Sequence, residues 1–182
     1  MDGPAVQYGR SAFDGVEVTI QVNVEQVLTS RNCGGGSSGG ELGDVTGDGY
    51  VDIVAIERTG DMYVYPGNGY SFNARYWVRS GWTGLNTAVG DVTGDGIADI
   101  VAVEGNGNMY VYPGNGYSFN ARYWVGNGWN GLSVNLGNVT GSAAADIVAV
   151  DGNGNMYVHP GNGYSFNARY WVGNGWNGPV IA

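Results

Sequence analysis

Two nine-residue segments of this chain carry acidic side chains at a spacing that suits a hard metal ion. Asp44–Asp52 and Asp91–Asp99 each place a carboxylate at positions 1, 5 and 9, around turn glycines. Calcium takes about six to eight oxygen ligands, and three carboxylates in one loop would repel one another without a cation. The segments therefore predict two calcium sites, with side-chain oxygens as ligands and a backbone carbonyl at position 7: Asp44, Thr46, Asp48, Tyr50 and Asp52, then Asp91, Thr93, Asp95, Ile97 and Asp99.

Neither segment is an EF-hand. Position 12, where an EF-hand has glutamate, is Ala55 in one loop and Ala102 in the other, and a strand pattern follows where a helix should begin. The alternative to metal binding is an Asx-rich turn with solvated carboxylates.

A third, related loop spans Asn138–Asp146 and keeps one carboxylate of the three, so its calcium affinity is expected to be much weaker or absent. It opens with the sequon Asn138-Val139-Thr140, which predicts a glycan on Asn138. An unused sequon remains an equally open alternative.

The three loops mark a repeat, because Asp44, Asp91 and Asn138 lie at intervals of 47 residues. Each unit contains β-branched and aromatic runs bounded by glycine, asparagine and proline, as short strands are. The 35 glycines also argue against long helices. Four strands per unit are the content of one propeller blade. The predicted fold class is all-β, with three four-stranded blades, and the alternative is a β-sandwich with a duplicated hairpin.

The repeat divides the chain into three parts. We expect a strand-forming segment at 1–33, a Gly/Ser linker at 34–40 and repeats at 41–84, 85–131 and 132–178, followed by a partial closing strand at 179–182. Three blades are fewer than the roughly four to eight that close a propeller. Association between chains is therefore predicted, with two chains in a six-bladed ring as the simplest case. The first repeat lacks the usual start of its inner strand, so this strand is expected to be completed either within a closed ring or by the tail of one chain in the first blade of the next.

The N-terminal segment contains one run of alternating apolar and polar residues, from Val16 to Val24. A lone strand is not stable, so this one must pair with a hairpin partner near residues 5–8, with the propeller edge or with a neighbouring chain. Repeated between chains, such a contact would build a filament. The predicted assembly residues are Val16, Val18, Ile20, Val22 and Val24, together with Val180 and Ile181 of the tail.

The loop and the strand after it resemble a known repeat. Residues 43–55 and 90–102 both read Gly-Asp-Val-Thr-Gly-Asp-Gly-x-x-Asp-Ile-Val-Ala, which is similar to the FG-GAP/VCBS repeat of integrin-like propellers, bacterial secreted proteins and a fungal lectin. The resemblance covers residues 41–182 and implies a calcium-stabilised, extracellular propeller used for binding. The aspartate that the family has at loop position 3 is Thr46 or Thr93 here, which is a weaker ligand.

Tryptophans recur in each unit beside asparagine and arginine, which suggests carbohydrate binding against an aromatic face. Packing inside the blades is the alternative, since blade cores also need large aromatic residues. The candidate ligand-binding residues are Trp77, Trp82, Trp124, Trp129, Trp171 and Trp176.

The leading functional prediction is a non-catalytic, lectin-like or protein-binding module. No Ser/His/Asp or Cys/His set supports an enzyme, and His159, at a position where other repeats have tyrosine, has no histidine or cysteine companion. The alternative is a structural subunit that self-assembles into an extracellular fibre or oligomer.

The amino-acid composition restricts the kinds of ligand and environment that are expected for this chain. Acidic residues outnumber basic ones 16 to 7 and there is no lysine, so nucleic acid is not expected as a ligand. The single cysteine, Cys33, excludes an intramolecular disulfide. No apolar run reaches the roughly 18 residues that suggest a membrane span, and the expected extracellular location rests on the resemblance, because no signal-peptide pattern opens the chain.

Overall fold

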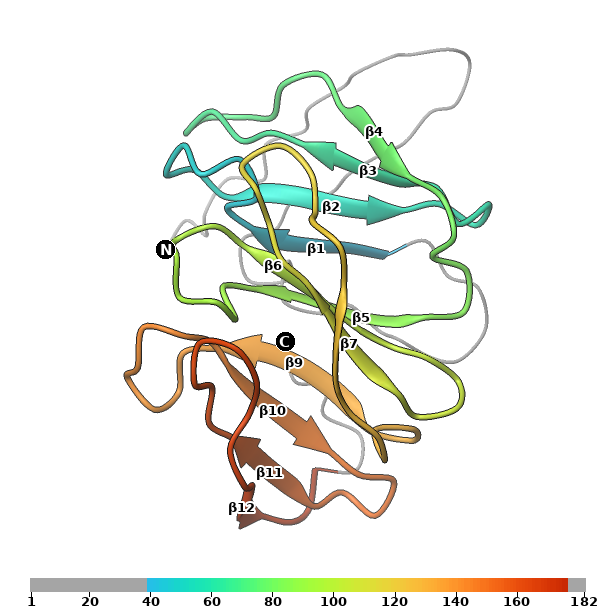
Figure 1. The fold of residues 1–182 in the computed structure, drawn as a ribbon, viewed down its shortest axis with the longest axis vertical. Helices are drawn as coiled ribbons and strands as arrows, with labels where there is room; N and C mark the ends of the chain where they lie inside the picture. The colour runs from blue at the N-terminus through green and yellow to red at the C-terminus, as the bar shows by residue number, and fades with distance from the viewer. Residues whose placement is uncertain (1–38, 177–182) are drawn as a thin grey trace, which may run out of the picture.

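The computed structural model describes residues 39–176, which form three four-stranded antiparallel sheets. The sheets follow one another down the long axis (Figure 1), and we call them blades 1, 2 and 3. Blade 1 comprises β1 (Gly39–Gly43), β2 (Asp52–Ile56), β3 (Met62–Tyr65) and β4 (Tyr76–Arg79). Blade 2 comprises β5 (Asn86–Gly90), β6 (Asp99–Val103), β7 (Met109–Tyr112) and β8 (Tyr123–Gly126). Blade 3 comprises β9 (Ser133–Gly137), β10 (Asp146–Val150), β11 (Met156–His159) and β12 (Tyr170–Gly173).

The all-β, four-stranded prediction is confirmed. No helix occurs in the described residues, and so none there could cross a membrane. The third strand of the blade alternates, since Met62 and Val64 of β3 are buried whereas Tyr63 and Tyr65 on the other face are half-buried. The second strand does not, because every residue of β6 is buried. Gly60, with a φ of 84°, makes the tight turn between β2 and β3, which a residue with a Cβ would strain.

The hydrophobic core lies between the blades. One cluster joins Met62 and Val64 of blade 1 to Ile100 of blade 2, and a second joins Val111 of blade 2 to Ile147 of blade 3. The first strand of each sheet contacts the first strand of the next, β1 with β5 and β5 with β9. Within the described residues no strand of blade 3 pairs with blade 1, so the three blades form an open array.

One expectation about blade 1 is wrong. Its inner strand is present: β1 starts in the glycine-rich stretch and pairs Gly43 with Asp52, in the register that pairs Gly90 with Asp99 in blade 2. Strand pairing uses backbone groups, which glycine supplies as other residues do. The tail of a second chain is therefore not needed to complete this sheet. The predicted strand at 16–24 and the assembly residues Val180 and Ile181 lie outside the described residues.

Candidate functional site

The ninth residue of each loop is a fully buried aspartate: Asp52, Asp99 or Asp146. Asp52 accepts N–H hydrogen bonds from Val45 and Thr46, both at 2.8 Å, on Oδ2, and from Gly67 at 2.8 Å on Oδ1. One side chain thus ties the acidic loop to the loop that follows β3. A buried carboxylate that satisfies several backbone donors is costly to remove, so this residue anchors its blade.

The anchor is repeated in the other two blades. Asp99 accepts from Thr93 and Gly114, each at 2.8 Å, and burial raises the pKa of Asp99 above its ordinary value. For Asp146, burial also acts to raise the pKa, but hydrogen bonds from Gly161 and Thr140 outweigh it and leave the pKa below its ordinary value. The third loop keeps this anchor although it has lost its other carboxylates.

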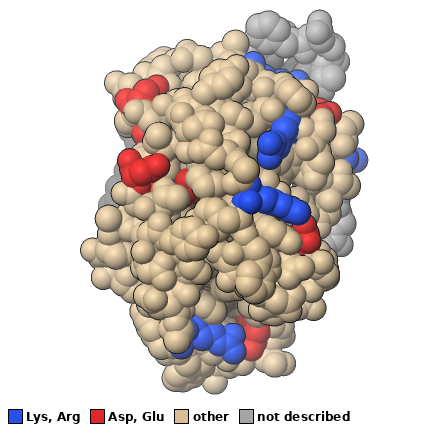
Figure 2. Space-filling model, viewed as in Figure 1, with Lys and Arg blue, Asp and Glu red and all other residues tan. Residues whose placement is uncertain are grey.

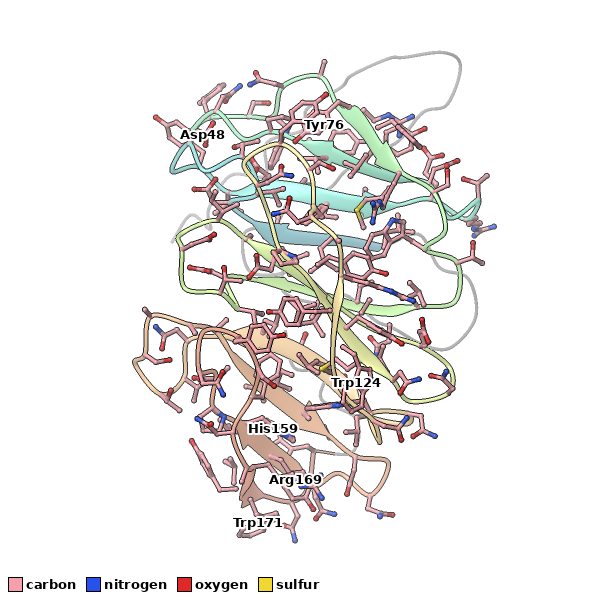
Figure 3. The ribbon with its side chains drawn as sticks, in the orientation of Figure 1. Asp48, Tyr76, Trp124, His159, Arg169 and Trp171 are labelled. Carbon is pink, nitrogen blue, oxygen red and sulfur yellow. The ribbon has the colours of Figure 1, made fainter. Side chains whose placement is uncertain are left out.

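The remaining carboxylates of the first loop lie at its rim. Asp44 accepts N–H bonds from Gly47 at 2.7 Å and Asp48 at 3.2 Å on Oδ1, and from Gly49 at 2.9 Å on Oδ2. Asp48 is exposed and accepts from Tyr50 at 2.8 Å. Figure 3 places Asp48 at the edge of blade 1 where acidic side chains gather in Figure 2. The second loop has the same bonds, from Gly94, Asp95 and Gly96 to Asp91 and from Ile97 to Asp95.

In this conformation the loops are closed by hydrogen bonds rather than arranged around a cation. Among the described residues, no group of three acidic, histidine or cysteine side chains lies close enough to hold a metal ion. One observation favours a bound cation: Thr46 Oγ1, a predicted ligand, is buried and has no hydrogen-bond partner in the described structure. Such an oxygen calls for a water or an ion. Calcium binding at these loops stays a prediction.

Asn138 opens the third loop and is exposed. Its side-chain oxygen accepts from Gly141 at 2.7 Å, and its side-chain nitrogen donates to the Ser142 carbonyl. The nitrogen that would carry a glycan is thus engaged in closing the loop. Glycosylation of Asn138 stays a prediction.

The six tryptophans separate into two sets. Trp77, Trp124 and Trp171 on the outer strands are 55% to 59% exposed. Trp82 and Trp129 are 3% and 9% exposed and pack between blades, where their ring centroids lie 4.8 Å from Tyr112 and 4.6 Å from His159. Trp176 is the equivalent residue of blade 3. Trp176 is 37% exposed because no described blade packs against it, so the first set is the one that stays exposed in all three blades.

Trp124 shows what surrounds an exposed tryptophan (Figure 3). It pairs across the strands with Tyr110, and the Arg122 guanidinium lies 3.8 Å from the centre of the Tyr110 ring. Arg122 is also bonded to Glu104 at 2.8 Å, and the indole N–H of Trp124 donates to Asn108 at 3.1 Å. An aromatic face thus stands beside donors and acceptors that are partly exposed.

The exposure of this set does not depend on a neighbouring blade. Trp77 lies on blade 1, which no blade precedes among the described residues, yet its exposure of 55% is close to the 57% of Trp124, which has blade 1 beside it. The outer strands therefore leave this tryptophan open wherever its blade stands in the array.

His159 stands where the other two repeats have Tyr65 and Tyr112. It packs against Trp129. Burial, followed by the charge of Arg169, lowers the pKa of His159 from 6.5 to about 4. Its Nε2 is buried without a partner in the described structure. The histidine is thus held neutral between blades 2 and 3.

Protonating His159 is expected to loosen blade 3. Because its folded pKa lies below its unfolded value, the neutral ring contributes fully above a pH of about 6.5, and this contribution is lost as the pH falls towards about 4. We expect His159→Tyr to lose less thermal stability than the parent chain over this range, as measured by circular dichroism. Melting curves that shift in parallel would contradict the assignment.

Comparison with known proteins supports the repeat and the fold. Residues 44–102 match the family model described as an FG-GAP-like repeat. A lectin from Agrocybe aegerita, described as specifically recognising non-reducing terminal N-acetylglucosamine, is similar in structure with a TM-score of 0.59 and 24% identity, over 78% of this chain and 39% of that chain. The Photorhabdus luminescens Tc holotoxin pore matches with a TM-score of 0.51 and 18% identity, over 75% of this chain and 7% of that chain.

The chain thus spans less than half the length of either solved structure, and identities this low establish the fold alone. A comparison with curated protein sequences finds no significant match.

Proposed function

We propose, from the FG-GAP-like repeat at residues 44–102 and the exposed tryptophans of the three blades, that this chain is a non-catalytic propeller module that binds carbohydrate. The main observation in support of this proposal is that Trp77, Trp124 and Trp171 are each exposed on an outer strand. Sugars offer C–H groups to an aromatic face and hydroxyls to nearby polar groups. Asn108, Arg122 and Glu104 supply such groups beside Trp124.

Three equivalent sites on one chain would also let weak individual contacts add up. Blades 1 and 2 each contain an Arg–Glu ion pair, with N–O distances of 2.7 Å and 2.8 Å. In all three blades an arginine stacks on a tyrosine. Linked sites that engage one branched or clustered glycan raise the apparent affinity without any new contact. Surface-bound glycans are therefore better targets than free sugars.

Calcium belongs to the same proposal. Its support is the three carboxylates of each of the first two loops and the unpartnered Thr46 Oγ1. Threonine at position 3 lowers the ligand charge, and weaker sites of this kind suit the calcium concentrations found outside cells. We therefore place the module in the extracellular space.

The binding proposal is tested with a fluorescently labelled full chain on a glycan array containing calcium. Glycans ending in N-acetylglucosamine are the first probes, because the Agrocybe aegerita lectin is described as recognising that sugar. Replacing all three exposed tryptophans by alanine is expected to weaken binding by at least about 30-fold, as aromatic contacts at the centre of a site do.

The matched control replaces the same three tryptophans by phenylalanine, which keeps an aromatic face and is expected to keep most of the binding. An array without signal, or an alanine variant that binds like the parent chain, would refute the carbohydrate assignment.

A further inference from the structure

The contact between neighbouring blades occurs twice within the chain in almost the same form. Tyr76 stacks on Tyr117 of the next blade with ring centroids 4.7 Å apart and planes 5° from parallel, and Tyr123 stacks on Tyr164 at 4.5 Å and 3°. A backbone bond accompanies each stack, from the Ala98 N–H to the Asp44 carbonyl at 2.7 Å and from Ala145 to Asp91 at 2.6 Å. This repeated contact defines what one blade presents to the next.

The same positions are uncovered at the two ends of the array. Ala98 and Ala145 are 5% and 7% exposed, but Val51, their equivalent on blade 1, is 53% exposed. Val45 and Val92 are fully buried, but their equivalent on blade 3, Val139, is 56% exposed. The residues that the blade contact buries internally are thus apolar and open at both ends.

The aromatic residues show a smaller difference, because Tyr117 and Tyr164 are still 65% and 63% exposed at the internal contacts. Tyr70, the equivalent of Tyr117 and Tyr164, is the most exposed large hydrophobic residue described, and Tyr170, the equivalent of Tyr76, is also exposed. Trp176, unlike Trp82 and Trp129, is exposed as well. We call Tyr50, Val51, Tyr65 and Tyr70 the leading face of blade 1, and Gly137, Val139, Tyr170 and Trp176 the trailing face of blade 3.

Backbone glycines mark the trailing face independently. A Cβ on Gly43 would lie 2.6 Å from Val89 of the next blade, and one on Gly90 would lie 2.8 Å from Leu136. At Gly137, the third equivalent, a Cβ would meet nothing within 4 Å. Glycine thus allows the next blade to approach closely at both internal contacts, whereas no described residue lies against Gly137 at the end of the array.

We propose that a second copy of this chain covers both faces, trailing face to leading face. In this joint Tyr170 of one copy stacks on Tyr70 of the other, Trp176 packs against Tyr65, and the Val51 N–H donates to the Asn138 carbonyl. Two copies give six blades, which falls within the roughly four to eight of closed propellers, whereas three copies would exceed it. Two such joints close a ring.

The charges at the joint favour this pairing. Within the chain, an acidic loop faces the loop of the next blade: Gly47 lies against Ile97, and Gly94 lies against Ala143 and Ala144. In the joint the third loop would face the first, which carries Asp48. The third loop has Asn138 and Ser142 where the first has aspartates, so like charges do not meet there. The joint also differs from the internal contacts in side-chain size, since Val51 and Tyr50 are larger than their equivalents Ala98 and Ile97.

The test uses two complementary variants of the full chain, Val51→Asp on the leading face and Val139→Asp on the trailing face. The parent chain is expected to have twice the 19.1 kDa chain mass by native mass spectrometry. Each variant places a charge in every joint, so its dimer dissociation constant should rise at least about 30-fold. In an equimolar mixture, the unchanged trailing face of the Val51→Asp chain can pair with the unchanged leading face of the Val139→Asp chain. The mixture should therefore recover dimers made of one chain of each kind.

Both positions are exposed, so circular dichroism should show that each variant folds like the parent chain. Trp124→Ala should leave the dimer mass unchanged, which separates this proposal from the carbohydrate proposal. A parent chain with the mass of one copy, variants that remain dimeric, or a mixture that recovers no dimer would each overturn the head-to-tail joint.

Discussion

Asp99→Ala is expected to lower the Tm of the chain by about 10 °C relative to the parent chain. The substitution removes the acceptor of two backbone N–H groups, the part-buried one of Thr93 and the buried one of Gly114. Leaving such donors unpaired costs about 1–3 kcal/mol each, so a total of about 2–6 kcal/mol is expected for the two groups. Such a loss corresponds to a shift in Tm of this size for a domain of this length.

The matched control is Asp95→Ala in the same loop. Asp95 is exposed and accepts one loop bond, from Ile97 at 2.9 Å, so its loss in the presence of a chelator should cost less than about 1 kcal/mol. Thermal melts with chelator and with calcium separate the two roles of the loop. Equal losses for the two variants in chelator would contradict the anchoring role of Asp99.

The same pair of variants tests the calcium proposal. Calcium should raise the Tm of the parent chain, and Asp95→Ala should reduce this gain because it removes one carboxylate of the second loop while the first loop stays intact. A parent chain whose Tm is the same in chelator and in calcium would refute the cation sites without affecting the hydrogen-bonded anchors.

Gly114→Ala is expected to be strongly destabilising although it adds only one methyl group. A Cβ at this position would overlap the Ala98 carbonyl oxygen and lie 2.7 Å from Ile97 Cγ2. Because the carbonyl belongs to the backbone, the blade must shift to make room, and overpacking of this kind costs about 1–3 kcal/mol or more. The shift would also lengthen the bond from the Gly114 N–H to Asp99. Urea denaturation measures the loss.

Gly105→Ala is the control for this substitution. A Cβ on Gly105 would meet nothing within 4 Å, so the free energy of unfolding should stay within about 0.5 kcal/mol of the parent value. If the two variants are equally stable, the close approach at Gly114 does not constrain the blade.

The repeat and its strands could be predicted from the sequence because β-branched and aromatic runs bounded by turn residues recur in each unit. These runs do not reveal which residues a neighbouring blade covers. Val51 and Ala98 occupy the same place in their repeats, yet one is exposed and the other buried, since burial depends on position in the array. For the same reason, the sequence alone did not separate the exposed tryptophans from the packed ones.

The anchoring role of Asp52, Asp99 and Asp146 was also missed, although a signal existed. The third loop replaces its other two carboxylates and keeps Asp146, which a purely metal-binding set would not explain. Likewise, β1 was not predicted because a glycine-rich stretch carries no side-chain pattern, while its backbone can still pair with β2.

The buried aspartate and the rim carboxylates depend on different bonds, and this separation has a consequence for divergence. The third loop keeps its hydrogen-bonded anchor after Asn138 and Ser142 have replaced acidic residues. Each repeat can therefore change the chemistry of its rim while its sheet stays folded. In an array built in this way, duplication copies the folded sheet, and later substitutions can change the rim of one loop without changing the others.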